Sequence, residues 1–128
     1  MWEFFECFDR RGQREFSLWR LELPRIERAL LDEKMRMIQV FGQASCLKGP
    51  IRGHRHLYKI RVQGPTVALR PLLCRGPIRM DREFTMLQQM TEVGGKDTPP
   101  GAKSEADRCR SEIIRDPSRR VRYEVPQP

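Results

Sequence analysis

Residues 57–79 read LYKIRVQGPTVALRPLLCRGPIR, and this stretch decides the fold class of the chain. Apolar and polar residues alternate through 56–63 and again through 66–75, as in half-buried strands. Gly64–Pro65 lies between them and is typical of a turn. Pro71 within the second strand favours an edge position or a bulge. The stretch also contains one lysine, four arginines and no acidic residue, so we expect its sheet to meet a negatively charged surface.

The residues before this hairpin predict one strand and two helices. Aromatic residues in 2–8 indicate a short strand. A first helix is expected over about 13–22, and Pro24 suits the first turn of a second helix that Gly42 ends. The apolar stripe expected to face the core from the second helix is Ile26, Ala29, Leu30, Met37, Val40 and Phe41.

The residues after the hairpin predict a last strand and a C-terminal helix. EFTMLQQM at 83–90 is strand-like, and an amphipathic helix is expected after the loop at 94–101. Hairpin-linked strands preceded by two helices indicate an α+β domain, with the helical hairpin packed against one face of a small antiparallel sheet. We expect this domain to span residues 1–115, with 116–128 as a C-terminal extension that ends in a frayed VPQP.

The net charge of +8 is concentrated in one segment. Residues 1–42 contain eight basic and eight acidic residues, and residues 83–128 again contain eight of each. Residues 48–82 contain nine basic residues and one acid, Asp81. A segment with one sign of charge favours a polyanion partner, and we expect nucleic acid or the ribosome.

Other classes of protein fit the sequence less well. No apolar run approaches the roughly 20 residues that cross a bilayer, and the acidic, aromatic start is unlike a signal peptide. We therefore expect a cytoplasmic protein that does not act at a membrane. The cysteines Cys7, Cys46, Cys74 and Cys109 form no CxxC pair, so we expect neither a metal site nor a small-molecule cofactor.

The basic segment is suited to metal-independent cleavage of RNA. The 2′-hydroxyl attacks the adjacent phosphate, and the protein must move two protons and stabilise the extra negative charge. Arginine forks bind phosphate oxygens, and a lysine or histidine with a lowered pKa transfers protons. The candidate catalytic residues are Lys59, Arg61 and Arg70 on the expected open face of the sheet, with His54 and His56 before it. The candidate RNA-binding residues are Lys48, Arg52, Arg55, Arg75 and Arg79.

Two runs of residues resemble a known family of toxins. The run 47–77, LKGPIRGHRHLYKIRVQGPTVALRPLLCRGP, and the run 83–93, EFTMLQQMTEV, are similar to the RelE/HigB-type toxins of the RelE/ParE superfamily, in the phage-derived HigB-like branch. The shared pattern is a basic turn, "L-Y-x-x-R" on one strand, an arginine on the next, and an "E-F-x-x-L" strand. The resemblance implies a RelE-like fold, in which a strand and a helical hairpin precede a curved antiparallel sheet.

The resemblance also implies a function. Such toxins belong to type II toxin–antitoxin systems and cleave mRNA on the ribosome without a metal, so mRNA and a cognate antitoxin that covers the basic face are the expected partners. Arg61, Arg70 and Lys48 match the family's basic residues. The last strand departs from the pattern, because LQQMTEV stands where many relatives have Leu-His-Gly-Phe-x-Lys-Lys. His54 or His56 would then have to move the proton.

Two other functions remain open at this point. One is a ParE-like protein that inhibits DNA gyrase by binding and does not cut RNA. The other is a basic module that binds RNA or the ribosome without catalysis. The arginines and lysine of the sheet favour the nuclease, whereas the altered last strand leaves room for both alternatives.

Overall fold

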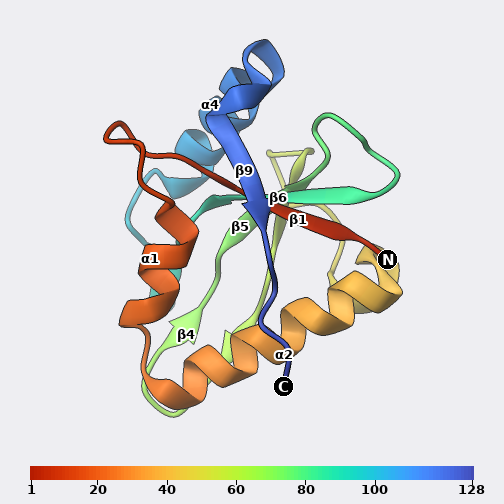
Figure 1. Cartoon of the computed structure of the whole chain (residues 1–128). Helices are drawn as coiled ribbons and strands as arrows, with labels where there is room; N and C mark the ends of the chain where they lie inside the picture. Colours follow the sequence, from red (N-terminus) through yellow and green to blue (C-terminus); the bar gives the residue numbers. More distant parts are fainter.

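The computed structural model describes the backbone of residues 1–128 and all side chains except those of residues 45 and 46. The helices are α1 (Glu15–Glu22), α2 (Arg25–Phe41), α3 (Gln43–Cys46), α4 (Ala102–Arg115) and the 3-10 turn η1 (Pro117–Arg119). The strands are β1 (Glu3–Cys7), β2 (Leu57–Lys59), β3 (Val62–Gln63), β4 (Ala68–Leu69), β5 (Leu72–Arg75), β6 (Glu83–Gln88), β7 (Thr91–Val93), β8 (Lys96–Thr98) and β9 (Arg120–Tyr123). The chain is therefore an α+β protein, as the sequence predicts (Figure 1).

The N-terminal strand lies inside the main sheet rather than at its edge. The order of this five-stranded sheet is β2-β5-β6-β1-β9. β1 pairs in parallel with β6 and antiparallel with β9. The prediction of a purely antiparallel sheet is therefore wrong. The helical hairpin carries the chain from β1 to the far edge, and two successive reversals then return β6 beside β1 in the same direction.

The strands of the hairpin extend beyond the main sheet and take part in a second sheet. β3 follows β2, β4 precedes β5 and β7 follows β6, each after a short interruption, and with β8 these three strands form a four-stranded sheet of order β3-β4-β7-β8. Pro71 separates β4 from β5, and the pairing register shifts between Leu72 and Leu73. Pro71 predicts either a bulge or an edge strand. The structure has the irregular pairing but not the edge strand, because β4 and β5 each lie between two strands.

Helices cover both faces of the main sheet (Figure 1). On one face, α1 and α2 bury Phe4, Phe16, Phe84 and their neighbours. On the other face, α4 packs through Ala102, Ala106 and Ile113 onto Leu57, Leu72, Cys74 and Leu87. The expected open face is therefore partly closed by α4. Among the described residues, no helix combines the length and apolar composition needed to cross a bilayer.

The helix α2 turns the opposite face from the predicted one toward the core. Ile26 is 57% exposed and Phe41 is 62% exposed, and Leu30, Met37 and Val40 are also exposed. The buried residues are Glu27, Leu31, Asp32, Met35 and Ile38. Two of these are acidic, so hydropathy alone selects the wrong face.

The two buried acids of α2 each have partners that offset their desolvation. The backbone N–H groups of Thr66 and Val67 both donate to Oε2 of Glu27 at 2.7 Å. Arg20 donates from Nε and Nη2 to the two carboxylate oxygens of Asp32, at 2.7 and 2.5 Å. A buried carboxylate is tolerated where such donors replace water.

The segment 116–128 is part of the packed domain. β9 pairs with β1 along its length, and Tyr123 and Val125 are each 5% exposed. Arg120 lies 3.8 Å above the ring of Phe5, and its Nη1 is 2.5 Å from Oε2 of Glu83. The frayed end expected from VPQP is therefore wrong at Val125. The composition of residues 116–128 does not show that one edge of β1 would be left unpaired without a strand from this segment.

A prediction follows from the close approach of Gly64 to Glu27. A Cβ at position 64 would lie 2.4 Å from Cγ of Glu27, and two backbone donors prevent that side chain from moving away. We expect Gly64→Ala to lower the free energy of unfolding by about 1–3 kcal/mol. Gly49→Ala is the matched control, because a Cβ there meets no atom within 4 Å. Urea unfolding of the two variants measures the difference, and equal midpoints would contradict the packing described.

Candidate nucleic-acid interface

The edge strand β2 and the helix α4 bring basic and titratable side chains together. β2 is the outer strand of the main sheet, and α4 packs beside it through the cluster that contains Leu57 and Ala106. Spacings of four and three place Lys103, Asp107 and Arg110 on one side of α4. We call the resulting surface the β2–α4 seam, and define it by His54, Arg55, His56, Lys59, Lys103, Asp107 and Arg110.

A histidine–aspartate pair lies at one end of the β2–α4 seam. Nδ1 of His54 is 2.5 Å from Oδ2 of Asp107. The loop before β2 fixes the backbone of this histidine, because His54 N–H donates to Ile51 and Leu57 N–H donates to His54, both at 2.9 Å. With Nδ1 engaged by the carboxylate, Nε2 is the nitrogen left for another partner. The His54 side chain is 24% exposed, so a ligand can reach it.

A surface pocket opens beside this pair. Its volume is about 690 Å³, and it is lined by Pro50, Ile51, Gly53, His54, Arg55, His56 and Asp107. Both histidines and an arginine therefore face one hollow. A hollow of this size accommodates part of a nucleotide, and its charged lining is suited to a phosphate.

The surroundings of His56 disfavour its protonated form. Burial, and then the positive charges of Arg110 and Arg55, lower its pKa below the ordinary value. Nε of Arg55 donates to Nε2 of His56 at 3.2 Å. The positive charges near His56 therefore make a bound anion favourable at this point of the seam.

Lys59 is the last residue of β2 and belongs to the β2–α4 seam. Burial and the nearby charge of Arg61 lower its pKa, while Asp97 opposes the change. Nζ of Lys103 forms an ion pair with Asp97 at 3.0 Å. Arg61 is exposed in the bend between β2 and β3. A lysine with a lowered pKa gives up its proton more readily than an ordinary surface lysine.

Arg70 does not share the exposure of Arg61. Its side chain is 12% exposed, and Nη1 donates to the carbonyls of Leu69 at 2.8 Å and Val62 at 3.2 Å. Its Nη2 lies 3.7 Å from Oε2 of Glu92. These contacts tie β3, β4 and β7 together. The structure therefore gives Arg70 partners within the protein, where the sequence analysis expected a phosphate.

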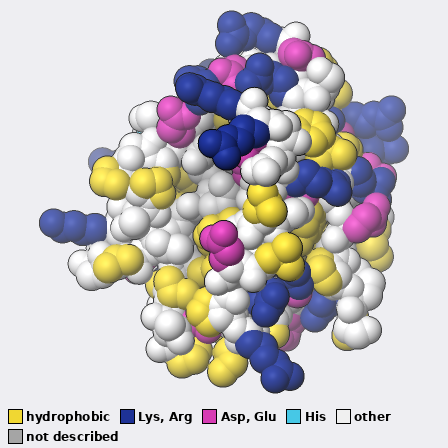
Figure 2. Space-filling model, turned by 60° about the vertical axis from the view of Figure 1, so that its left-hand side comes forward, with side chains coloured by type: hydrophobic (Ala, Val, Ile, Leu, Met, Phe, Trp, Pro, Cys, Tyr) yellow, Lys and Arg dark blue, Asp and Glu magenta, His cyan; other side chains and the backbone are white. Residues whose placement is uncertain are grey.

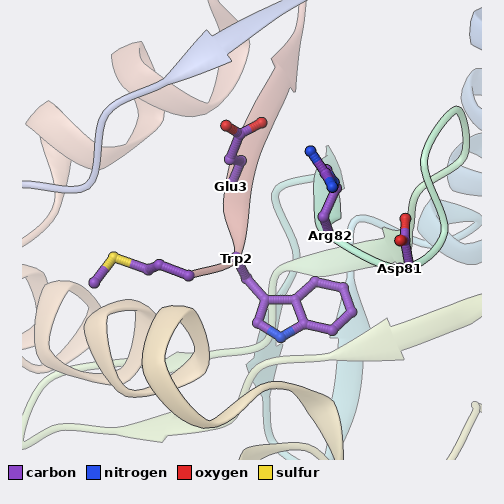
Figure 3. A pocket seen from close by; sticks show the side chains of 5 residues that line it. Trp2, Glu3, Asp81 and Arg82 are labelled. Carbon is purple, nitrogen blue, oxygen red and sulfur yellow. The ribbon is translucent and has the colours of Figure 1, made fainter.

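Arg75 and Arg79 do not line the His54 pocket. The guanidinium of Arg75 is 5.1 Å from the ring of Trp2, and its Nε donates to the carbonyl of Met80. Arg79 is in the loop between β5 and β6. A second pocket of about 320 Å³ near Trp2 is lined by groups of both signs, Glu3, Asp81 and Arg82 (Figure 3). With two carboxylates and one guanidinium, this pocket is a poorer phosphate site than the His54 pocket, where one carboxylate lies with an arginine and two histidines.

The remaining basic candidates differ in position. Lys48 and Arg52 are exposed in the loop before β2, and the two sequence neighbours of Arg52 line the His54 pocket. On the face shown in Figure 2, Lys and Arg side chains alternate with Asp and Glu side chains, and neither histidine is visible. That face is therefore not where the histidines gather.

The sequence analysis missed the contribution of α4. Lys103, Asp107 and Arg110 lie outside the apolar positions that indicate an amphipathic helix, and their shared spacing was the available signal. That signal could not show which strand they would meet. Among the described side chains, no group of three or more His, Cys, Asp or Glu residues is arranged to hold a metal. The side chain of Cys46 lies outside the described residues.

Comparison of the chain with protein-family models, curated proteins and solved structures gives no match. The arrangement of the site itself therefore carries the functional argument.

The charge environment of His56 gives a prediction. Replacing Arg110 by Gln removes a cation that lowers the pKa of His56, so we expect that pKa to rise. An NMR titration of the imidazole resonances measures the change. Arg115→Gln, at the exposed C-terminal end of α4, is the matched control and should leave the titration unchanged. A His56 pKa that stays the same or falls in the Arg110 variant would show that the two groups do not interact.

Proposed function

We propose that this chain is a metal-independent endoribonuclease, and that it acts as a RelE/HigB-type toxin of a type II toxin–antitoxin system on mRNA at the ribosome. The observation that carries the proposal is His54, which is hydrogen-bonded to Asp107 and whose imidazole faces a pocket also lined by Arg55 and His56. The order of the elements, a strand and helical hairpin before a bent sheet, is consistent with the RelE-like fold that the sequence resemblance implies. The proposal also implies a cytoplasmic protein.

The residues of the β2–α4 seam supply each part of the proposed reaction. Asp107 orients the ring of His54, and Nε2 accepts the proton of the RNA 2′-hydroxyl. The 2′-oxygen then bonds to phosphorus, and the bond from phosphorus to the 5′-oxygen breaks. Lys59, with its lowered pKa, donates a proton to that leaving oxygen. Arg55 and Arg110 stabilise the charge that develops on the phosphate.

This assignment differs from the usual pattern of the family at the last strand. Gln88, Gln89 and Glu92 stand where many relatives have a histidine, a glycine and a lysine, and Glu92 pairs with Arg70. In the proposal, proton transfer therefore moves from the last strand to the His54–Asp107 pair. A second candidate function is a basic module that binds RNA or the ribosome without cutting. The Arg70–Glu92 pair favours it, because these two residues occupy the positions where the family has catalytic residues.

Inducible expression in a bacterium with mapping of mRNA ends tests the proposal. We expect growth arrest and new mRNA ends with the wild type, and about a 100-fold or greater loss of cleavage with His54→Ala or Asp107→Asn. Arg115→Gln is the control, since this residue is on α4 but outside the β2–α4 seam. Arg61→Ala should weaken cleavage by lost phosphate binding without a loss of stability, because its side chain is exposed.

The contrary outcomes separate the alternatives. Slowed translation without new ends, in a wild type that is folded and expressed, would favour the binding module. A DNA-damage response without new ends would favour gyrase inhibition. Cleavage that persists in the His54 and Asp107 variants would show that the protein is a nuclease but that these residues are not its catalytic site. Ribosome binding should also weaken steeply as salt rises, because phosphate contacts release counterions.

A further inference from the structure

Two cysteines far apart in the sequence lie in contact where α4 meets the sheet. Sγ of Cys7, at the end of β1, is 2.9 Å from Sγ of Cys109 in α4. Cys7 is 4% exposed and donates to the carbonyl of Met86 at 3.4 Å, whereas Cys109 is partly exposed. The two sulfurs are closer than nonbonded sulfur atoms normally approach, so a small shift brings them to the bonded length of about 2.05 Å.

We propose that Cys7 and Cys109 are an oxidisable pair, and that a disulfide between them fastens α4 to β1. A peroxide or a low-molecular-weight disulfide, such as oxidised glutathione, is the oxidant. With glutathione, the thiolate of Cys109 attacks the disulfide, forms a mixed disulfide and releases one glutathione thiolate. The thiol of Cys7 then loses its proton and attacks Sγ of Cys109, which releases the second glutathione. Two thiols are oxidised and one disulfide is reduced.

The order of these steps follows from the surroundings of the thiols. Cys109 is the more exposed of the two, so it meets the oxidant first. The hydrogen bond to Cys109 and then burial raise the pKa of Cys7, so Cys7 is the less reactive thiol as long as Cys109 is unmodified. Cys74 is buried in the same cluster, and burial raises its pKa to about 12, so it stays a thiol.

The position of Cys109 connects this pair with the β2–α4 seam. Cys109 lies between Asp107 and Arg110 in the sequence of α4. The bond would therefore hold the helix that carries these two residues against the sheet. This consequence rests on the proposed function, whereas the formation of the bond does not.

The test uses the purified full chain and oxidised glutathione, with dithiothreitol to reverse the reaction. We expect the intact mass to fall by two hydrogens, and a proteolytic fragment that joins Cys7 to Cys109. Because the bond closes a loop of roughly 100 residues, the melting temperature should rise by about 5–15 °C and return on reduction. Cys109→Ser should abolish both effects, and Cys74→Ala should retain them.

Two results would overturn the proposal. One is glutathione attached to Cys109 with no joined fragment, which would mean that Cys7 cannot resolve it. The other is a joined fragment that contains Cys46 or Cys74 in place of one member of the pair. Neither readout depends on RNA cleavage, so loss of the proposed nuclease would leave this result interpretable. If cleavage is found, its rate in the oxidised and reduced forms shows whether the bond acts on the site.

Discussion

The whole fold depends on the pairing of β1 on both of its edges. β6 lies along one edge in parallel, and β9 lies along the other in the opposite direction. Because β1 is interior, its side chains enter both cores: Phe4 packs under α1 and α2, and Cys7 packs under α4. The placement of α4, and so of Asp107 against His54, follows from this central strand.

Buried charge fixes how the elements meet around β1. Glu6 has no exposed surface, and its carboxylate accepts the N–H of Ser17 at 2.9 Å and the hydroxyl of the same residue at 2.5 Å, which sets the start of α1 over the strand. Glu27 fixes the turn between β3 and β4 in a comparable way. Burial acts to raise the pKa of Glu27, but the N–H donors of Val67 and Thr66 outweigh it and the pKa is lowered. Its stabilisation is therefore present above the pKa of the unfolded chain and is lost as pH falls.

These buried carboxylates explain what could and could not be predicted from the sequence. Periodicity located the helices and most strands, because alternation and helical spacing are local properties. It failed on the orientation of α2, since Glu27 and Asp32 face inward only when Thr66, Val67 and Arg20 are in place. It also missed the parallel pairing and β9, which depend on contacts between distant parts of the chain.

The candidate site could be predicted only in part. The excess of basic residues marked the loop before β2 and β2 itself, but the roles of Asp107 and Arg110 depend on how α4 packs, which the sequence does not show. Arg70 matched a family pattern, yet its backbone carbonyl partners could not be read from that pattern.

The central position of β1 also bears on the order in which the molecule assembles. β1 is synthesised before β9, but Cys7 of β1 is paired in the sheet with Arg120 of β9. A nascent chain that has reached β6 can close one edge of β1 but leaves the other edge open, with its backbone groups unpaired. The main sheet is therefore complete only once residues 120–123 are available, because this pairing links distant parts of the sequence. Until then the growing chain presents a sheet edge that a chaperone or another strand can occupy.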